Sequence, residues 1–277
     1  MGEEELVLDG LSVDELMRVV GVRGASKPAL GEARSDAARP KVSIPRNAFP
    51  APSPLDSAAS RPAKAIPDVP GQPIEVGGAL ADGAGAIAGA LESLAAVAAA
   101  VAACKLCGLH ATATNHVPGE GNPNAGFVCV GEAPGATEDA TGRPFVGASG
   151  ELLTKILEAI NFKREQVFIC NVIKHRPPGN RNPQSDEIAA CSPFLMRQLA
   201  LLQPKVILAL GTFAAQTLLQ TSLPLGKLRG QIHRFHGVPL IVTYHPAALL
   251  RNPNWKRPAW EDVQLARRVF DSPTSGA

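Results

Sequence analysis

The stretch that decides the fold is FVCVGEAPGATEDATGRPFVGASG, from Phe127 to Gly150. Its first four residues form a short apolar run that is typical of a buried parallel strand. The glycines and the proline of the following GEAPG turn end that strand, because they supply backbone conformations that other residues resist. A helix is expected to begin near Gly150. The stretch therefore predicts a strand, a glycine-rich turn and a helix in succession.

Glu132 stands at the carboxyl end of this predicted strand. In open α/β sheets, ligands bind beyond the carboxyl ends of the strands, so a carboxylate at this position is a candidate site residue. The alternative is an acid that caps the next helix. Pro-Gly follows instead of a helical run, which favours the site over the cap.

Apolar strands alternate with helical patterns through the rest of the C-terminal part. Strands are predicted at Phe127–Val130, Val167–Val172, Val206–Leu210 and Leu240–Thr243. Helices are predicted to begin near Gly150, Ser185 and Thr212, with a last one over residues 259–270. This alternation predicts an α/β fold with three αβα layers and a central, mainly parallel four-stranded sheet. His245 follows the fourth strand. Two strand ends, at Glu132 and His245, therefore carry candidate catalytic side chains.

The N-terminal part has a different composition. Residues 1–86 are rich in proline and alanine and have no sustained period, so we expect a disordered extension ahead of a domain over residues 87–277. Within the extension, Leu11 to Val22 has helical spacing and is either a short docking helix or a helix that forms only transiently. Ile87 to Ala103 predicts an alanine-rich lead-in helix that is too weakly apolar to span a bilayer.

Charge also separates the two parts. Residues 1–103 hold 9 Lys and Arg against 13 Asp and Glu, whereas residues 104–277 hold 18 against 12, a net charge of +6. Basic residues gather in KHRPPGNR (Lys174–Arg181) and LLRNPNWKRP (Leu249–Pro258). Such loops are expected to contact a phosphate backbone. Loops that are merely solvated are the alternative.

Cysteine spacing adds a candidate metal site. No secretory signal is visible and the first residues are acidic, so we expect a cytoplasmic protein with reduced cysteines and no membrane association. Cys104 and Cys107 form a C-x-x-C pair just after a helix, which favours a metal or iron–sulfur site. Further ligands are available at Cys129, Cys170, His175 and Cys191. Cys129 and Cys170 lie inside apolar strands and are more simply buried small hydrophobes.

Several motifs in order carry a resemblance to a known family. They are the C-x-x-C, the GEAPG turn with Glu138 and Asp139 behind it, GRPFVG, the Asn171 strand end with RPPGNR, the Cys191 helix and HPAALLRNP. Residues from about 104 to 270 resemble the family-four uracil-DNA glycosylases, the iron–sulfur branch of that superfamily. The resemblance implies a monomeric repair enzyme that hydrolyses the N-glycosidic bond of uracil in single- or double-stranded DNA. The N-terminal third lies outside it and is a candidate segment for binding a repair or replication protein.

The resemblance implies a role for each of four residues near the predicted site. Glu132 corresponds to the acid that positions or activates water and favours a cationic sugar. His245 corresponds to the histidine that donates a hydrogen bond to a uracil oxygen as negative charge develops there. Phe145 corresponds to the aromatic ring on which the flipped base stacks, and Asn171 to the amide that pairs with the uracil edge.

Further contacts follow from the same motifs. The GEAPG backbone is expected to contact the base through Gly131, Ala133 and Gly135. Glu138 is expected to crowd the position where thymine carries its methyl group. On the DNA side, the resemblance implies a wedge that fills the vacated base stack, Leu249, and phosphate contacts at Arg251, Lys256 and Arg257.

The cofactor is where the sequence departs from the family pattern. The resemblance implies a [4Fe-4S] cluster on Cys104, Cys107 and Cys191, with His175 at the position of the usual third cysteine. Either His175 ligates iron, or the cluster is altered, labile or absent. Relatives that crosslink to uracil sites carry a basic insertion with a reactive histidine after this segment. This chain has RPPGNRNP instead, so we expect turnover rather than a permanent adduct.

Two other function classes compete with this interpretation. A non-catalytic DNA-binding module would use the same basic loops. The presence of Glu132, Phe145, Asn171 and His245 together argues against it. A nucleotide-binding α/β enzyme is disfavoured because the sequence lacks both the GxGxxG fingerprint and a Walker lysine.

Overall fold

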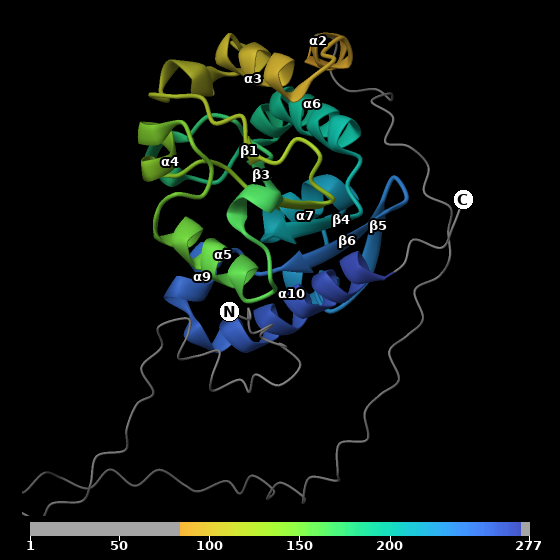
Figure 1. Ribbon diagram of the computed structural model, residues 1–277. Coiled ribbons are helices and arrows are strands. Elements are labelled where there is room, and N and C mark those ends of the chain that lie inside the picture. The colour runs from red at the N-terminus through yellow and green to blue at the C-terminus, as the bar shows by residue number, and fades with distance from the viewer. Residues whose placement is uncertain (1–83, 273–277) are drawn as a thin grey trace, which may run out of the picture.

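The structure is a computed structural model that describes residues 84–272, in which helices cover both faces of one sheet (Figure 1). The strand order is β1-β3-β2-β4-β6-β5. The four central strands are parallel, namely β3 (Phe168–Asn171), β2 (Phe127–Gly131), β4 (Val206–Leu210) and β6 (Val238–Thr243). The predicted α/β fold with a four-stranded parallel centre is therefore confirmed.

Two short edge strands extend the sheet beyond the prediction. β1 (Glu120–Gly121) pairs antiparallel with β3, and β5 (Ile232–Phe235) pairs antiparallel with β6. Neither strand has a continuous apolar run, and β5 is only partly buried over its first three residues. Edge strands need not be apolar on both faces, so their sequences carry a weaker signal than those of the central strands.

The four predicted helices are present and form the two outer layers. They are α5 (Ala148–Glu158), α6 (Ser185–Leu202), α7 (Thr212–Leu219) and α10 (Lys256–Asp271). One core lies between the sheet and α6 with α7, and the second lies between the sheet and α5 with α10. Within β2, Val128 and Val130 enter the first core while Phe127 and Cys129 enter the second, as the alternation of side chains along a strand requires.

Shorter elements connect these layers. They are α4 (Ala136–Thr141), α8 (Leu225–Leu228), α9 (Pro246–Arg251) and the 3-10 turns η2 (Gly108–Ala111), η3 (Arg164–Gln166), η4 (Pro178–Asn180) and η5 (Pro253–Trp255). α4 begins directly after the GEAPG turn, with Gly135 as its N-cap residue. A helical run therefore does follow Pro-Gly, contrary to our expectation, although Glu132 lies three residues ahead of the cap.

The alanine-rich lead-in is two helices rather than one. α2 (Ala84–Gly89) and α3 (Leu94–Ala102) are separated at Ser93, whose hydroxyl oxygen accepts a hydrogen bond from the Ala96 N–H at 3.1 Å and so caps α3. Both helices pack on α6 around Phe194. The predicted boundary between the N-terminal extension and the domain, at residue 86, falls inside α2 and remains a prediction. The predicted helix at residues 11–22 lies outside the described residues. Between residues 84 and 272, no helix is both long and apolar enough to cross a membrane.

Candidate active site

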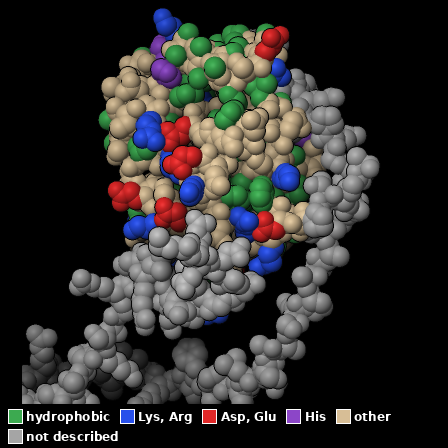
Figure 2. All heavy atoms as spheres, viewed as in Figure 1, with side chains coloured by type: hydrophobic (Ala, Val, Ile, Leu, Met, Phe, Trp, Pro, Cys, Tyr) green, Lys and Arg blue, Asp and Glu red, His purple; other side chains and the backbone are tan. Residues whose placement is uncertain are grey.

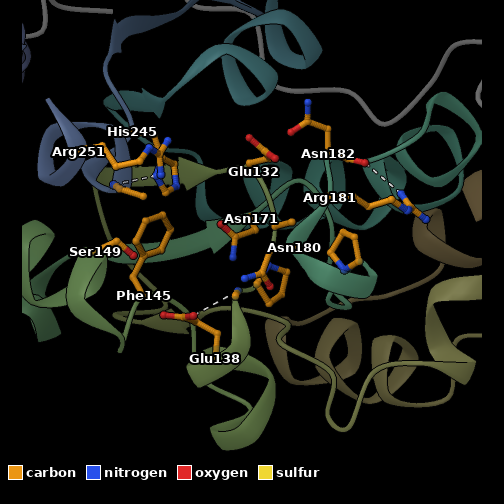
Figure 3. Close-up of a pocket in the computed structure, with 15 residues that line it drawn as sticks. Glu132, Glu138, Phe145, Ser149, Asn171, Asn180, Arg181, Asn182, His245 and Arg251 are labelled. Atoms are coloured by element: carbon orange, nitrogen blue, oxygen red, sulfur yellow. Dashed lines mark hydrogen bonds between the residues drawn. The ribbon is translucent and has the colours of Figure 1, made fainter.

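A pocket of about 370 Å³ lies at the carboxyl ends of β2, β3 and β6. Most of the predicted catalytic and base-contacting residues line it, namely Glu132, Ala133, Gly135, Glu138, Phe145, Asn171 and His245. Figure 3 shows Phe145 and His245 close together on one side, and Glu132 and Glu138 on opposite sides of Asn171. The parallel strands therefore bring together residues that are more than 100 positions apart in the sequence.

Asn171 ends β3 and is 1% exposed. Its side-chain oxygen, Oδ1, is buried and has no hydrogen-bond partner. Gly131 of β2 makes room for this amide, since a Cβ there would lie 2.3 Å from Asn171 Oδ1 and 2.5 Å from Phe145 Cζ. An orphaned buried acceptor is costly to maintain, so its place in a pocket wall points to a ligand that donates an N–H.

Phe145 has a left-handed backbone, with φ 50, which is uncommon for a bulky residue. Glu138 holds the segment that follows, because its Oε1 accepts the N–H groups of Val146 and Gly147, each at 2.9 Å. Gly150 is required nearby, since a Cβ there would lie 1.9 Å from the Phe145 carbonyl oxygen. The ring position is thus set by backbone contacts on its C-terminal side.

Glu138 itself is engaged with the backbone through both carboxylate oxygens. Besides Val146 and Gly147, it accepts the Gly135 N–H at 3.2 Å through Oε2. It therefore joins the GEAPG turn to the Phe145 segment. The sequence motif did not reveal this fastening role, and the predicted contact with a thymine methyl group stays a prediction.

His245 caps α9 and is held as a neutral ring. Its Nδ1 accepts the Ala247 N–H at 3.2 Å, so the single proton of the neutral imidazole sits on Nε2. Burial is the main cause that lowers the pKa of His245 to about 4; Arg251 contributes to the shift, and Glu138 opposes it. The ring centroid lies 5.4 Å from that of Phe145. His245 is therefore a neutral N–H donor at physiological pH.

Glu132 is partly buried at the end of β2. Burial raises the pKa of its carboxyl above the ordinary 4.5. A carboxylate that is partly removed from water is a stronger base than an exposed one. Glu132 thus has the character of a general base or an electrostatic stabiliser.

Residues 118–264, more than half of the 277-residue chain, match the family described as the uracil DNA glycosylase superfamily. The chain belongs to this superfamily. A type-4 uracil-DNA glycosylase of Sulfurisphaera tokodaii is 44% identical over 192 residues, covering 66% of this chain and 87% of that protein. Type-4 enzymes of Pyrobaculum aerophilum and Thermotoga maritima are 48% and 45% identical, covering 58% and 59% of this chain and 87% and 88% of their own lengths. These relatives confirm the predicted type-4 branch of the superfamily.

The loop after β3 contributes pocket residues that were not predicted from the sequence. Asn180, Arg181 and Asn182 line the pocket, and so does Ser149 of α5. Arg181 is fixed by a bidentate pair with Glu187, with N–O distances of 2.6 and 2.9 Å. One feature of the sequence could have indicated that this loop lines the pocket. The loop directly follows the strand that ends at Asn171 and so begins at the same edge of the sheet.

Lys174 is an exception among the basic residues of the loop that was predicted to contact phosphates. It is fully buried, and its Nζ donates to the Asn171 carbonyl oxygen and to Gln198 Oε1, each at 2.6 Å. Gln198 in turn donates to the Pro118 carbonyl oxygen at 2.7 Å. Lys174 therefore supports the strand end that carries Asn171 and cannot reach a phosphate.

The predicted DNA-facing residues of this glycosylase differ in exposure. Leu249, predicted as the wedge, is 2% exposed and packs with Leu152 and Ala259, because it lies on the inner face of α9. It is therefore enclosed in the core, whereas the adjacent Leu250 is 46% exposed. Arg251 lines the pocket and Arg257 is open to solvent. On the face shown in Figure 2, basic and acidic side chains are interspersed rather than gathered in one basic patch.

The cysteines predicted as cluster ligands approach one another without forming a finished metal site. Cys107 packs against the core that contains Cys191, and the pKa of Cys191 is raised to about 12, mainly by burial and also by Cys107 and Cys104. Across residues 84–272, no three His, Cys, Asp or Glu side chains are placed to hold a metal ion. Cys129 and Cys170 are buried strand residues, as predicted.

His175, the predicted fourth ligand, is buried beside other titratable groups. Burial lowers its pKa, followed by the effects of His116 and His110, with Asp139 opposing. His110 also contacts the Cys107 carbonyl oxygen through Nδ1 at 2.6 Å. The donor chemistry suits an iron–sulfur cluster, although the four side chains are not gathered around one point.

Proposed function

We propose that this chain is a monofunctional uracil-DNA glycosylase, which hydrolyses the N-glycosidic bond of uracil in DNA and leaves an abasic site for base excision repair. The observation that carries the proposal is the unpaired Oδ1 of Asn171 in the wall of a pocket that also holds Phe145 and a neutral His245. Family membership and the type-4 relatives agree with it.

Base recognition rests on the Asn171 amide. Its orphaned Oδ1 accepts the N3–H of uracil, and its Nδ2 donates to O4. Cytosine presents the reverse pattern at this edge, so it would leave polar groups unpaired on both partners and be rejected. Phe145 provides the ring on which the extruded base stacks, since a base in a duplex must leave the helix before it can react.

Bond cleavage rests on His245 and Glu132. The Nε2–H of His245 donates to a uracil oxygen, and this bond strengthens as the departing base becomes an anion. The Glu132 carboxylate positions or deprotonates water and favours the cationic character that develops on the sugar. In the reaction the C1′–N1 bond breaks and water is consumed. The hydroxyl of the water bonds to C1′ of the sugar, and its proton ends on the departing base.

Contacts to the DNA strand come from α9 and the start of α10. Leu250 takes the wedge position in place of the enclosed Leu249, since it is the exposed leucine of this helix. Arg251, Lys256 and Arg257 are proposed to contact phosphates, as the sequence predicted. Monomeric action, a cytoplasmic location and a protein partner for the N-terminal segment also remain predictions.

The cofactor belongs to the same proposal. Cys104, Cys107 and Cys191 would hold a [4Fe-4S] cluster, with His175 as the fourth ligand. A bound cluster would act as a structural cross-link between the segment after α3 and α6. It would also fix the segment that joins Asn171 to His175, because the Lys174 N–H donates to Cys191 Sγ at 3.2 Å.

The test is incubation of the purified full chain with a single-stranded oligonucleotide that contains one uracil, in excess over protein. We expect free uracil and abasic sites beyond one equivalent of protein, and His245→Ala to lower the single-turnover rate far more than DNA affinity. Salt-dependent binding without uracil release would instead indicate a DNA-binding module. A protein–DNA adduct that survives denaturing electrophoresis would indicate a crosslinking variant.

A further inference from the structure

Three flat side chains are stacked next to the active site. The indole of Trp255, at the end of η5, lies on the ring of Tyr244 with centroids 4.7 Å apart and an interplanar angle of 9°. The guanidinium of Arg229 lies 4.2 Å from the centroid of the same tyrosine ring. We call this arrangement of Arg229, Tyr244 and Trp255 the aromatic stack.

The lower end of the aromatic stack is fixed. Arg229 donates through Nε to Asp262 Oδ2 at 2.7 Å and also donates to the Pro258 carbonyl oxygen. Its side chain is 13% exposed, and the carboxylate of Asp262 is 2% exposed. Because Arg229 is held by a buried ion pair, the ring above it is preorganised rather than free to reorient.

The upper end of the stack is open. Trp255 is 38% exposed although Tyr244 covers one of its ring faces. The accessible surface therefore belongs to the other face and the edges of the indole. Leu250, 46% exposed, is a second large apolar side chain left open on the neighbouring helix α9.

The position of the stack relates it to the pocket. Tyr244 directly precedes His245, and α9, which begins after His245, carries both Leu250 and Arg251. Arg251 lines the pocket, and Arg257, directly beyond Trp255 and Lys256, is exposed. An apolar ring flanked by cations at the edge of an active site matches a strand that presents bases and phosphates together.

We propose that the aromatic stack is a platform on which Trp255 stacks a nucleobase of the DNA strand that flanks the extruded uracil. This inference rests on the proposed function, since it places the DNA strand across the same pocket. Base–aromatic stacking tolerates every base, so the platform adds affinity without adding sequence preference. It also favours single-stranded or locally opened DNA, in which a flanking base is free to leave its neighbours.

Intrinsic fluorescence gives a direct test because the chain has two tryptophans, Trp255 and Trp260. Trp260→Phe leaves Trp255 as the reporter, and titration with a uracil-free single-stranded oligonucleotide should quench its emission as a base stacks on it. Trp255→Phe is the matched control; it leaves Trp260, which packs against the core under α10 and should respond little. Unchanged Trp255 emission at DNA concentrations that saturate binding by anisotropy would overturn the inference.

Binding and kinetics provide a second test. Trp255→Ala should weaken affinity for single-stranded DNA roughly tenfold, while Trp255→Phe should keep most of it. The salt dependence of binding should stay that of the parent, whereas Arg257→Ala should reduce the salt slope by about 1. In uracil release from single-stranded DNA, Trp255→Ala should raise KM far more than it lowers kcat, because the lost contact is one of binding. A slower chemical step with parental affinity would show that Trp255 only supports Tyr244 and His245.

The two proposals fail separately. A parent that releases uracil, with Trp255→Ala equal to it in affinity, would refute the platform and leave the glycosylase intact. A parent that quenches and binds DNA but releases no uracil would refute the proposed activity and leave the platform.

Discussion

At the scale of single residues, burial sets the chemistry of the site. The two strand-end groups shift in opposite directions: the pKa of Glu132 is raised and that of His245 is lowered. Both shifts favour the neutral forms, because burial penalises charge. A neutral His245 suits its task as a donor, whereas Glu132 must lose its proton to act. The acid limb of activity therefore belongs to Glu132.

We expect the single-turnover rate of the parent to fall as pH drops through the raised pKa of Glu132, at a pH above 4.5. His245, with a pKa of about 4, stays neutral through this range. Glu132→Gln should lower the single-turnover rate, and the residual rate of this variant should no longer fall as pH drops through this range. An acid limb that persists unchanged in Glu132→Gln would assign it to another group.

The same carboxyl should also affect stability. Its folded-state pKa is raised, so the folded state binds more protons than the unfolded state between 4.5 and that pKa, and stability falls as pH rises across this window. Glu132→Gln should therefore raise the unfolding temperature at neutral pH while activity is lost. A lower unfolding temperature would show that the carboxylate is stabilised by its surroundings.

Lys174 is a positioning residue, and its removal should affect both fold and activity. Lys174→Met leaves two buried acceptors unpaired, the Asn171 carbonyl oxygen and Gln198 Oε1, at about 1–3 kcal/mol each. Denaturant unfolding should show this loss, and uracil release should slow because Asn171 is less well held. Arg257→Met, at an exposed position, is the control and should leave the free energy of unfolding unchanged. Parental stability of Lys174→Met would show that water replaces the ammonium group.

At the scale of elements, the GEAPG turn and the Phe145 segment act as one unit. Glu138 joins them through three backbone N–H groups, and Gly131 leaves the space in which Asn171 and Phe145 meet. The glycines in the sequence indicated where this unit lies. The sequence did not indicate the hydrogen bonds of Glu138 that hold the unit together. The role of Glu138 depends on where the chain returns eight residues later, which local sequence does not encode.

Gly131→Ala tests this unit. The added methyl group would overlap Asn171 Oδ1 and the Phe145 ring, so we expect uracil release to fall by orders of magnitude. Gly226→Ala is the matched control, because no atom lies within 4 Å of the Cβ position in α8, and it should retain full activity. Near-parental activity of Gly131→Ala would mean that the amide and the ring separate easily.

At the scale of the whole molecule, the proposed cluster would connect segments far apart in sequence. Iron and sulfide analysis of anaerobically purified protein should show a cluster in the parent. His175→Cys should keep or increase its content, and His175→Ala should lower it through loss of a ligand. His236→Ala, at an exposed turn, is the control. Equal iron and sulfide in His175→Ala and the parent would show that His175 is not a ligand.

Sequence alone determined the central strands and the strand ends that hold Glu132, Asn171 and His245. These features are local: apolar runs bury strands on both faces, and glycine and proline end them. Parallel strands align their carboxyl ends, and for this reason the three residues meet at one edge of the sheet.

Only the tertiary structure decided which of two neighbouring residues is enclosed. Leu249 is buried and Leu250 exposed, and Lys174 is buried beneath the loop that its basic composition assigned to phosphates. The orphaned oxygen of Asn171 and the Arg229–Tyr244–Trp255 stack are likewise invisible in sequence. Burial and hydrogen-bond satisfaction depend on what distant segments place against a side chain, and residue type and spacing do not specify those partners.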